Sequence, residues 1–245
     1  MKLLASRGIP PAIAIAVYMM AAAQPLHAEV KAMTKKVAGT TVHYKVVLPN
    51  GYDPGKEYPG ILAFGGGPQT MNTVDRTLMR NFREEAEKRG YIVIAPAAPA
   101  GQVFFQGGAR IVPEFLTMVL ADYKIQHGRF HIAGPSNGGI AAFHVAAEHP
   151  QYFLSVTAFP GYMWEPSAAK LQAISQMCVF MYVGELDTYM WHGEMKSEAE
   201  FLRSQGTRAR YTVEKGQPHG LDTLAGANAG RLFDGFEEAG NGCRQ

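Results

Sequence analysis

The sequence lacks an excess of charge of either sign. Of its 23 lysines and arginines, Lys2 and Arg7 fall within the first 28 residues, which leaves 21 basic against 21 acidic residues in the remainder. No block of basic residues interrupts that remainder. Nucleic acids and anionic membrane surfaces attract proteins through such blocks or through net positive charge. We therefore expect no binding of nucleic acid, and a ligand that is neutral or weakly charged.

The N-terminal apolar stretch, residues 9–23, is shorter than the ~20 apolar residues of a membrane-spanning helix, and prolines interrupt it. It follows Lys2 and Arg7 and precedes a small residue, Ala28, which is the pattern of a secretory signal peptide. We expect residues 1–28 to be such a peptide, cleaved after Ala28, and the mature protein to be secreted or periplasmic without stable membrane insertion. An uncleaved N-terminal anchor is the alternative.

Cysteine is scarce, with two residues in the chain. Cys178 opens an apolar run and Cys243 lies beyond the last predicted helix. In a layout of parallel strands and crossover helices, the end of a helix returns to the edge of the sheet where strands begin, so the two could form a disulfide. Alternatively, Cys178 is a small buried apolar residue and Cys243 a free thiol.

Linkers, internal repeats and low-complexity tracts are absent from residues 29–245, which we therefore interpret as one domain. From residue 61 onward, short apolar runs typical of strands alternate with segments of helical periodicity. Such alternation predicts an α/β fold with a mostly parallel central sheet and helices on both faces. The expected strands are residues 40–48, 61–64, 91–99, 130–133, 153–159, 178–184 and 209–216; the expected helices are residues 73–89, 112–123, 139–149, 168–176, 195–205 and 224–238.

Ligands of open parallel sheets bind at the carboxyl ends of the strands. One such end reads GPSNGG, in which Ser136 lies between Gly134 and Gly138. This is the G-x-S-x-G pattern of a nucleophile elbow, a tight strand-to-helix turn that exposes a serine hydroxyl and leaves space only for glycine beside it. The pattern alone is weak, but here an apolar run precedes it and a helical segment follows. We therefore predict that Ser136 is a nucleophile.

A serine hydroxyl needs a base, and histidine is suited to that role near neutral pH. Among eight histidines, His219 is the best candidate because it lies in a Pro-His-Gly loop after the last predicted strand; His192 is second. The histidine in turn needs an orienting carboxylate. Asp187, in the loop after strand 178–184, is our candidate, with Glu185 two residues away as its rival and Glu165 as a remoter one.

Acyl transfer builds negative charge on the former carbonyl oxygen, which backbone amides stabilise. One donor is expected from Asn137, the residue after the serine. The other is expected from the glycine loop after strand 61–64, with Gly66 first and Gly67 next.

With these motifs in place, the chain resembles the secreted α/β-hydrolases of the esterase and depolymerase group, which includes polyhydroxybutyrate depolymerases and feruloyl esterases. The resemblance rests on HYKVVLPNGYDPGKEYPGILAFGGG, GPSNGG, GELD and PHG. It implies the α/β-hydrolase fold, the triad Ser136, Asp187 and His219, and hydrolysis of a small or polymeric carboxylic ester through an acyl-enzyme, without a metal or an organic cofactor. Phe64 departs from the family pattern, which has histidine there, and this weakens the assignment of the Gly66 donor.

Aromatic residues after two of the strands are candidates for a substrate pocket. Trp164, Tyr189 and Trp191, together with Tyr162, follow strands 153–159 and 178–184 and are expected above the sheet edge that carries Ser136. They could equally pack in the core. Two other functions stay open at this point: a serine peptidase of the prolyl-oligopeptidase type, and a non-catalytic binding protein on the same fold.

Overall fold

Strands that are apolar along their whole length form the centre of the sheet. In the computed structural model, which describes residues 30–243, strands β4 (Ile92–Pro96) and β7 (Cys178–Gly184) are buried at every position. Parallel strands covered by helices on both faces have this character. The described residues form one eight-stranded sheet in the order β1-β2-β4-β3-β5-β6-β7-β8.

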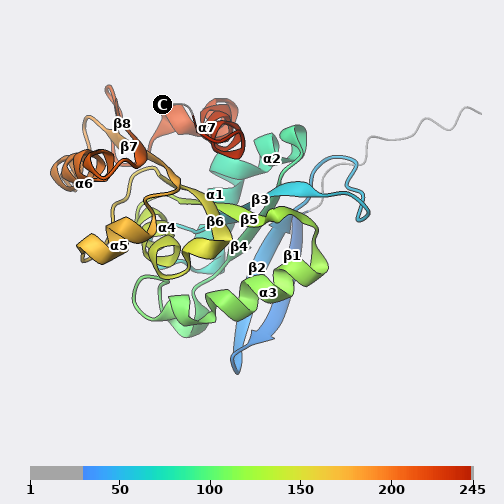
Figure 1. Cartoon of the computed structure of the whole chain (residues 1–245). Helices are drawn as coiled ribbons and strands as arrows, with labels where there is room; N and C mark the ends of the chain where they lie inside the picture. Colours follow the sequence, from blue (N-terminus) through green and yellow to red (C-terminus); the bar gives the residue numbers. More distant parts are fainter. Residues whose placement is uncertain (1–29, 244–245) are drawn as a thin grey trace, which may run out of the picture.

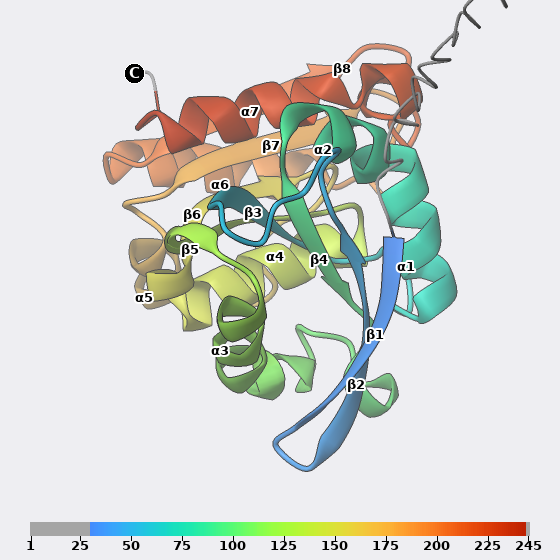
Figure 2. The ribbon, with the colours of Figure 1, turned by 90° about the vertical axis from the view of Figure 1, so that its right-hand side faces the viewer.

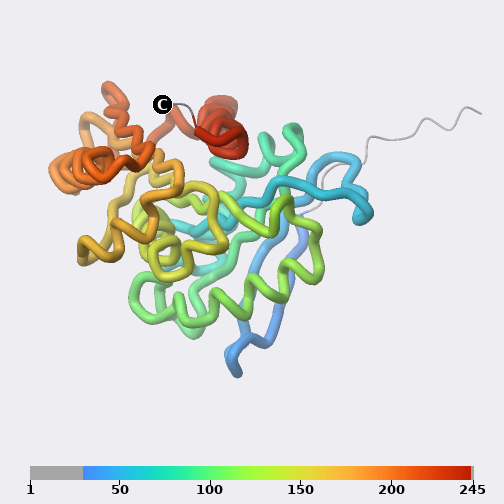
Figure 3. The backbone as a smooth tube through the Cα atoms, viewed as in Figure 1, coloured from blue at the N-terminus to red at the C-terminus, as the bar shows by residue number. Residues whose placement is uncertain are grey.

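The sheet is antiparallel only at its N-terminal edge, where β1 pairs with β2 and β2 with β4. From β4 to β8 all neighbours are parallel. Figure 3 traces how successive strand-helix units proceed from the blue N-terminal hairpin to the red C-terminal helix. The remaining strands are β1 (Val30–Val37), β2 (Thr40–Val47), β3 (Tyr58–Ala63), β5 (Ile125–Gly134), β6 (Phe153–Ala158) and β8 (Arg208–Glu214).

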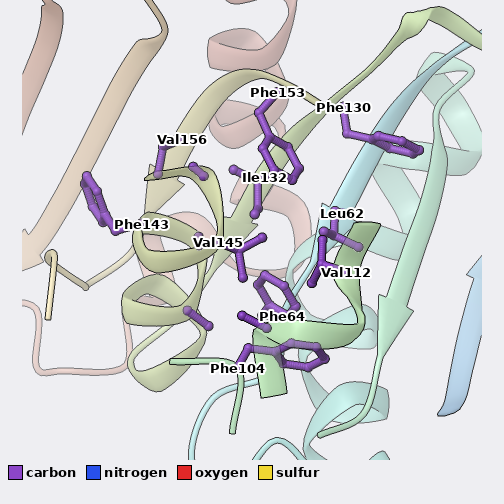
Figure 4. Packing of buried hydrophobic residues seen from close by; sticks show 14 of the residues in the cluster. Leu62, Phe64, Phe104, Val112, Phe130, Ile132, Phe143, Val145, Phe153 and Val156 are labelled. Carbon is purple, nitrogen blue, oxygen red and sulfur yellow. The ribbon is translucent and has the colours of Figure 1, made fainter. Parts of the chain in front are cut away.

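Helices cover both faces of the sheet (Figures 1 and 2). One face packs against α1 (Met71–Thr77), α2 (Arg83–Arg89) and α7 (Gly230–Gly240). The other packs against α3 (Val112–Asp122), α4 (Asn137–Glu148), α5 (Ala168–Ala173) and α6 (His192–Ser204). Figure 4 shows the core on this second face, with Leu62 and Ile132 from the strands beside Val112 and Val145 from the helices. The predicted fold, a mostly parallel sheet between helices, is confirmed.

Several boundaries differ from the expected ones by a few residues; for example, β5 begins at Ile125 and not at residue 130. Three differences have a physical cause in the backbone. Strand β1 was not predicted; it pairs with β2 through a two-residue turn in which Ala38 and Gly39 both have positive φ, 46° and 76°, as tight hairpin turns require. The helix expected over residues 73–89 is divided by a π-helical segment, Leu78–Phe82, between α1 and α2. The last helix begins at Gly230 instead of residue 224, because residues 222–228 form short 3₁₀ turns around Gly226, whose φ is 54°.

The structure pairs the two cysteines. Cys178, the first residue of β7, and Cys243, after α7, form a disulfide with Cα atoms 6.1 Å apart, which lies in the usual range for such bridges. The predicted signal peptide, residues 1–28, lies outside the described residues. Within residues 30–243, none of the helices has both the length and the apolar character needed to cross a bilayer.

Candidate active site

Ser136 lies on a strained turn between β5 and α4. Its φ of 56° and ψ of −126° are rare for a residue with a side chain. The turn is held by the Ser136 amide, which donates to the Pro160 carbonyl at 2.7 Å. A Cβ added at Gly134 or Gly138 would lie 2.6 Å or 2.5 Å from backbone atoms of neighbouring segments. The glycines of the motif are therefore required by close packing, and the elbow presents its hydroxyl at the carboxyl edge of the sheet.

His219 bridges Ser136 and Asp187. Its Nε2 lies 2.9 Å from Ser136 Oγ, and its Nδ1 lies 2.9 Å from Asp187 Oδ2. The Asp187 side chain is fully buried, and its other oxygen, Oδ1, accepts the amide of Tyr189 at 2.8 Å. Both carboxylate oxygens are thus held, so the imidazole is fixed in one orientation. The structure brings together the three residues that the sequence placed in a triad.

The rival residues have other partners. Glu185 Oε2 accepts the amide of Gly216 at 2.8 Å, in the turn after β8. Glu165 is exposed, and its backbone carbonyl accepts a hydrogen bond from Lys170 Nζ at 3.0 Å. His192 begins α6, where its backbone carbonyl accepts the Tyr211 hydroxyl. In the described part of the chain, the imidazole within hydrogen-bond distance of Ser136 is that of His219.

The two residues predicted to supply oxyanion donors, Asn137 and Gly66, lie beside Ser136 in the structure. Asn137 is the first residue of α4, so its amide has no acceptor within the helix. Gly66, in the loop after β3, lies against the elbow, because a Cβ placed on it would be 3.2 Å from Pro135 O and 3.7 Å from Ser136 Cβ. Within residues 30–243 the Gly66 amide donates no backbone hydrogen bond. Both amides are available to a third group.

Gln69, which the sequence did not single out, joins the three segments around these amides. It is fully buried and has a φ of 52°. Its Nε2 donates to the Asn137 carbonyl at 3.3 Å, and its Oε1 accepts the Phe104 amide at 2.8 Å. In addition, Asn137 Nδ2 donates to the Gly67 carbonyl at 2.9 Å. The glycine loop is therefore tied to the elbow by side-chain amides.

Phe64 stands where the family pattern has a histidine, and it fixes the start of the glycine loop by apolar packing. It is fully buried, and its ring centroid lies 4.4 Å from that of Phe104, as Figure 4 shows. Together with Gln69, this packing holds the start of the glycine loop. The loop is thus fixed without the histidine that the family pattern would place here.

Comparison with known proteins identifies the family. Residues 36–233 match the model of the family described as "Esterase: Putative esterase". The chain belongs to this esterase family. The coverage spans every residue of the site described above, from Gly66 to His219.

The sequence relatives and the solved structures that match this chain have names that describe different activities. The chain is 35% identical over 130 residues to dipeptidyl-peptidase 5 of Porphyromonas gingivalis, a match covering 47% of this chain and 19% of that protein. It spans less than a third of the curated relatives it matches. Thermogutta terrifontis esterase 2, phosphorylated by paraoxon, superposes with a TM-score of 0.65 at 17% identity, over 91% of this chain and 97% of that one. The feruloyl esterase module of Clostridium thermocellum superposes with a TM-score of 0.59 at 19% identity, over 78% and 82%.

In this esterase-family protein, two of the predicted pocket aromatics contact His219. The ring centroids of Tyr189 and Trp191 lie 4.4 Å and 5.0 Å from that of His219, and Tyr162 packs on Trp191 at 5.2 Å. The ring of Trp164 instead lies 6.1 Å from that of Phe105 and is 39% exposed. Tyr189 and Trp191 therefore border the site, and Trp164 lies apart from the His219 ring.

A pocket of about 270 Å³ opens beside the triad, and these aromatic residues do not line it. It is bordered by residues adjacent to the triad and the amides, namely Gly66, Pro135 and Gly220. Its outer wall comes from α1 and the π-helical segment, with Arg76 and Arg80 one turn apart. The predicted site did not include this wall, whose one signal in the sequence is a pair of arginines four residues apart. Residues 30–243 contain no cluster of three or more potential metal ligands.

Proposed function

We propose that the protein is a secreted serine hydrolase that cleaves a carboxylic ester through an acyl-enzyme, with Ser136, His219 and Asp187 as its triad. One observation carries the proposal: a continuous chain of contacts runs from the Ser136 hydroxyl on a strained elbow, through His219, to the buried Asp187 carboxylate. This is the arrangement that activates a serine for attack on a carbonyl. With all three members in contact, it also disfavours a non-catalytic binding protein.

The reaction follows from the positions of the atoms. Ser136 Oγ attacks the ester carbonyl carbon while its proton passes to His219 Nε2, and the resulting imidazolium is stabilised by Asp187. The negative charge on the carbonyl oxygen is accepted by the amides of Gly66 and Asn137. His219 then donates the proton to the leaving alcohol, and the acyl group stays on Ser136. Water, deprotonated by His219, releases the acid in the same way.

The proposal includes export and the absence of nucleic-acid partners. Export is supported by the N-terminal pattern of residues 1–28 and by a disulfide, which persists in oxidising compartments. Balanced charge over the remaining residues argues against nucleic acid and against an anionic membrane surface as partners. The ester substrate is a small molecule or a polymer.

A specific observation favours a second candidate, a serine peptidase. The relatives matched at 35% and 26% identity are dipeptidyl-peptidases, although the matched regions cover 19% and 30% of their lengths. The same triad serves both reactions, because ester and amide carbonyls pass through similar tetrahedral intermediates.

A substrate panel separates the two candidates. We expect the purified protein to hydrolyse p-nitrophenyl esters of short acyl chains and to leave dipeptidyl p-nitroanilides essentially uncleaved. The measurement is kcat/KM across an ester series of increasing chain length and a dipeptide anilide series. Faster cleavage of the anilides than of every ester would replace the esterase proposal with the peptidase.

The role of Gln69 makes a separate prediction. Its replacement by leucine removes the hydrogen bonds to Asn137 O and Phe104 N and frees the loop that positions the Gly66 amide. Loss of one donor to the developing oxyanion costs about 10²–10³-fold in kcat, so a misplaced donor should lower kcat by roughly 10–100-fold and change KM little. Exposed Gln172, replaced by leucine, is the matched control. An unchanged kcat for Gln69→Leu, or a loss confined to KM, would rule out this role.

A further inference from the structure

The pocket beside the triad is lined by a cation that pairs with no acidic residue among residues 30–243. Arg76 is exposed and lines it, and the salt bridges among residues 30–243 do not include Arg76. Two acidic residues of neighbouring segments pair with other cations. Asp75, the residue before Arg76, pairs with Lys45 at 3.1 Å, and Asp222, in the turn after His219, pairs with Arg80 at 2.5 Å. The guanidinium of Arg76 is therefore free to bind an anionic ligand.

Arg80 fixes the wall that presents Arg76. It lies in the π-helical segment, and its partner Asp222 follows His219 by three residues. The same segment is tied to the chain after His219 by Asn81, whose Nδ2 donates to the Leu224 carbonyl at 2.8 Å. Departures of this kind from α-helical geometry are frequent at functional sites. Here they attach the arginine wall to the loop that carries the histidine.

The rest of the pocket limits what enters it. Side chains of Pro68, Phe159 and Leu221 supply apolar surface, and about 270 Å³ is smaller than most pockets for whole ligands. The space suits a short chain or one ring. A group that has its ester carbonyl at Ser136 and extends into this pocket would meet the Arg76 guanidinium.

We propose that this pocket binds a carboxylate carried by the ester substrate, so that the preferred substrates are short esters with one free acid group, recognised by Arg76. Arginine suits this role because its planar guanidinium can bind both oxygens of a carboxylate. The inference rests on the proposed hydrolase function for its catalytic consequence, whereas carboxylate binding itself does not require turnover.

Pairs of isosteric esters test the preference. On the acyl side, p-nitrophenyl hydrogen glutarate is compared with p-nitrophenyl 5-methylhexanoate, in which an uncharged isopropyl group replaces the carboxylate. On the alcohol side, 4-acetoxybenzoate is compared with 4-isopropylphenyl acetate. A hydrogen bond to a charged group contributes ~1.5–3 kcal/mol, so we expect kcat/KM to favour one anionic member by about 10–100-fold. The pair that shows the preference tells which side of the ester occupies the pocket.

Two variants on the same helical stretch decide whether Arg76 is the cause. Arg76→Gln should abolish the preference, so that the two members of the pair are hydrolysed with kcat/KM values within about twofold of each other. Arg83→Gln, which removes an arginine that pairs with Glu87 and does not line the pocket, should retain the preference. Raising the salt concentration should weaken it in the wild type, because salt screens an exposed charge pair. Equal rates for both members of both pairs, or a preference that survives Arg76→Gln, would overturn the proposal.

A binding measurement keeps this inference separate from the proposed function. The affinity of Ser136→Ala for monoethyl glutarate is measured by isothermal titration calorimetry. We expect this affinity to be about tenfold or more weaker in Ser136→Ala/Arg76→Gln. Binding that depends on Arg76, in a protein whose wild type hydrolyses no ester, would contradict the proposed function and support the pocket. Hydrolysis of neutral esters together with no Arg76-dependent binding would support the function and refute the pocket.

Discussion

Ser136→Ala is expected to abolish ester hydrolysis, with kcat/KM reduced by about 10⁴-fold or more, as removal of the serine does in triads. The fold should be unchanged, because the turn is held by Gly134, Gly138 and the hydrogen bond from the Ser136 amide to Pro160 O, none of which uses the hydroxyl. The measurement is kcat/KM for the best p-nitrophenyl ester, with circular dichroism as the check on folding.

Ser155→Ala is the matched control. Ser155 is a buried serine on the adjacent strand, and its Oγ lies 2.8 Å from the Nδ1 of His131, outside the proposed triad. This change is expected to affect stability more than rate. If Ser136→Ala kept even a tenth of the wild-type activity, nucleophilic catalysis by Ser136 would be untenable.

The second large effect is expected from Asp187→Asn, a loss of about 10⁴-fold in kcat/KM, because an amide in place of the carboxylate favours the wrong tautomer of the histidine. The structure gives the physical reason: Asp187 Oδ2 lies 2.9 Å from His219 Nδ1, and the side chain is fully buried. Water therefore cannot easily take the place of the missing acceptor.

Glu185→Gln is the control that the sequence offers two residues away. The carbonyl oxygen of a glutamine can still accept the Gly216 amide that Glu185 accepts now, so we expect a loss of less than about tenfold. Both variants are compared by kcat/KM on the same ester. The reverse ranking would transfer the acid to Glu185, and mild effects of both would redirect attention to Glu165.

Most of the fold could be predicted from the sequence because buried strands and half-buried helices differ in their patterns of apolar residues. Strands such as β7 are apolar throughout, and the helices between strands have polar faces, so a parallel sheet between helices was the natural prediction. Strand β1 could not be predicted because its sequence, VKAMTKKV, mixes lysines with apolar residues and its pairing depends on a turn at Ala38 and Gly39. A π-helical segment has no residue signature distinct from an α-helix, and its identification required the backbone.

The site divides in the same way. Ser136 and His219 could be predicted because tight turns require glycine or proline beside the functional residue, and these residue types can be recognised in the sequence. The choice between Asp187 and Glu185 could not follow from alternation, because residues two apart on a strand point to the same face; the difference arises from the turn that directs Glu185 toward Gly216. Gln69 bonds to residues 35 and 68 positions away in the sequence, and no local pattern marks such contacts.

Covalent labelling of the nucleophile tests the central claim most directly. The protein is incubated with diethyl p-nitrophenyl phosphate, which reacts with activated serines, and the modified residue is located by fragmentation of the tryptic peptide spanning residues 130–170. That peptide contains Ser136, Ser155 and Ser167, so it carries its own internal comparison. We predict one diethylphosphoryl group per molecule, on Ser136, with hydrolysis lost in proportion to labelling. An active protein that stays unlabelled, or one that loses activity through modification of a different residue, would contradict the account.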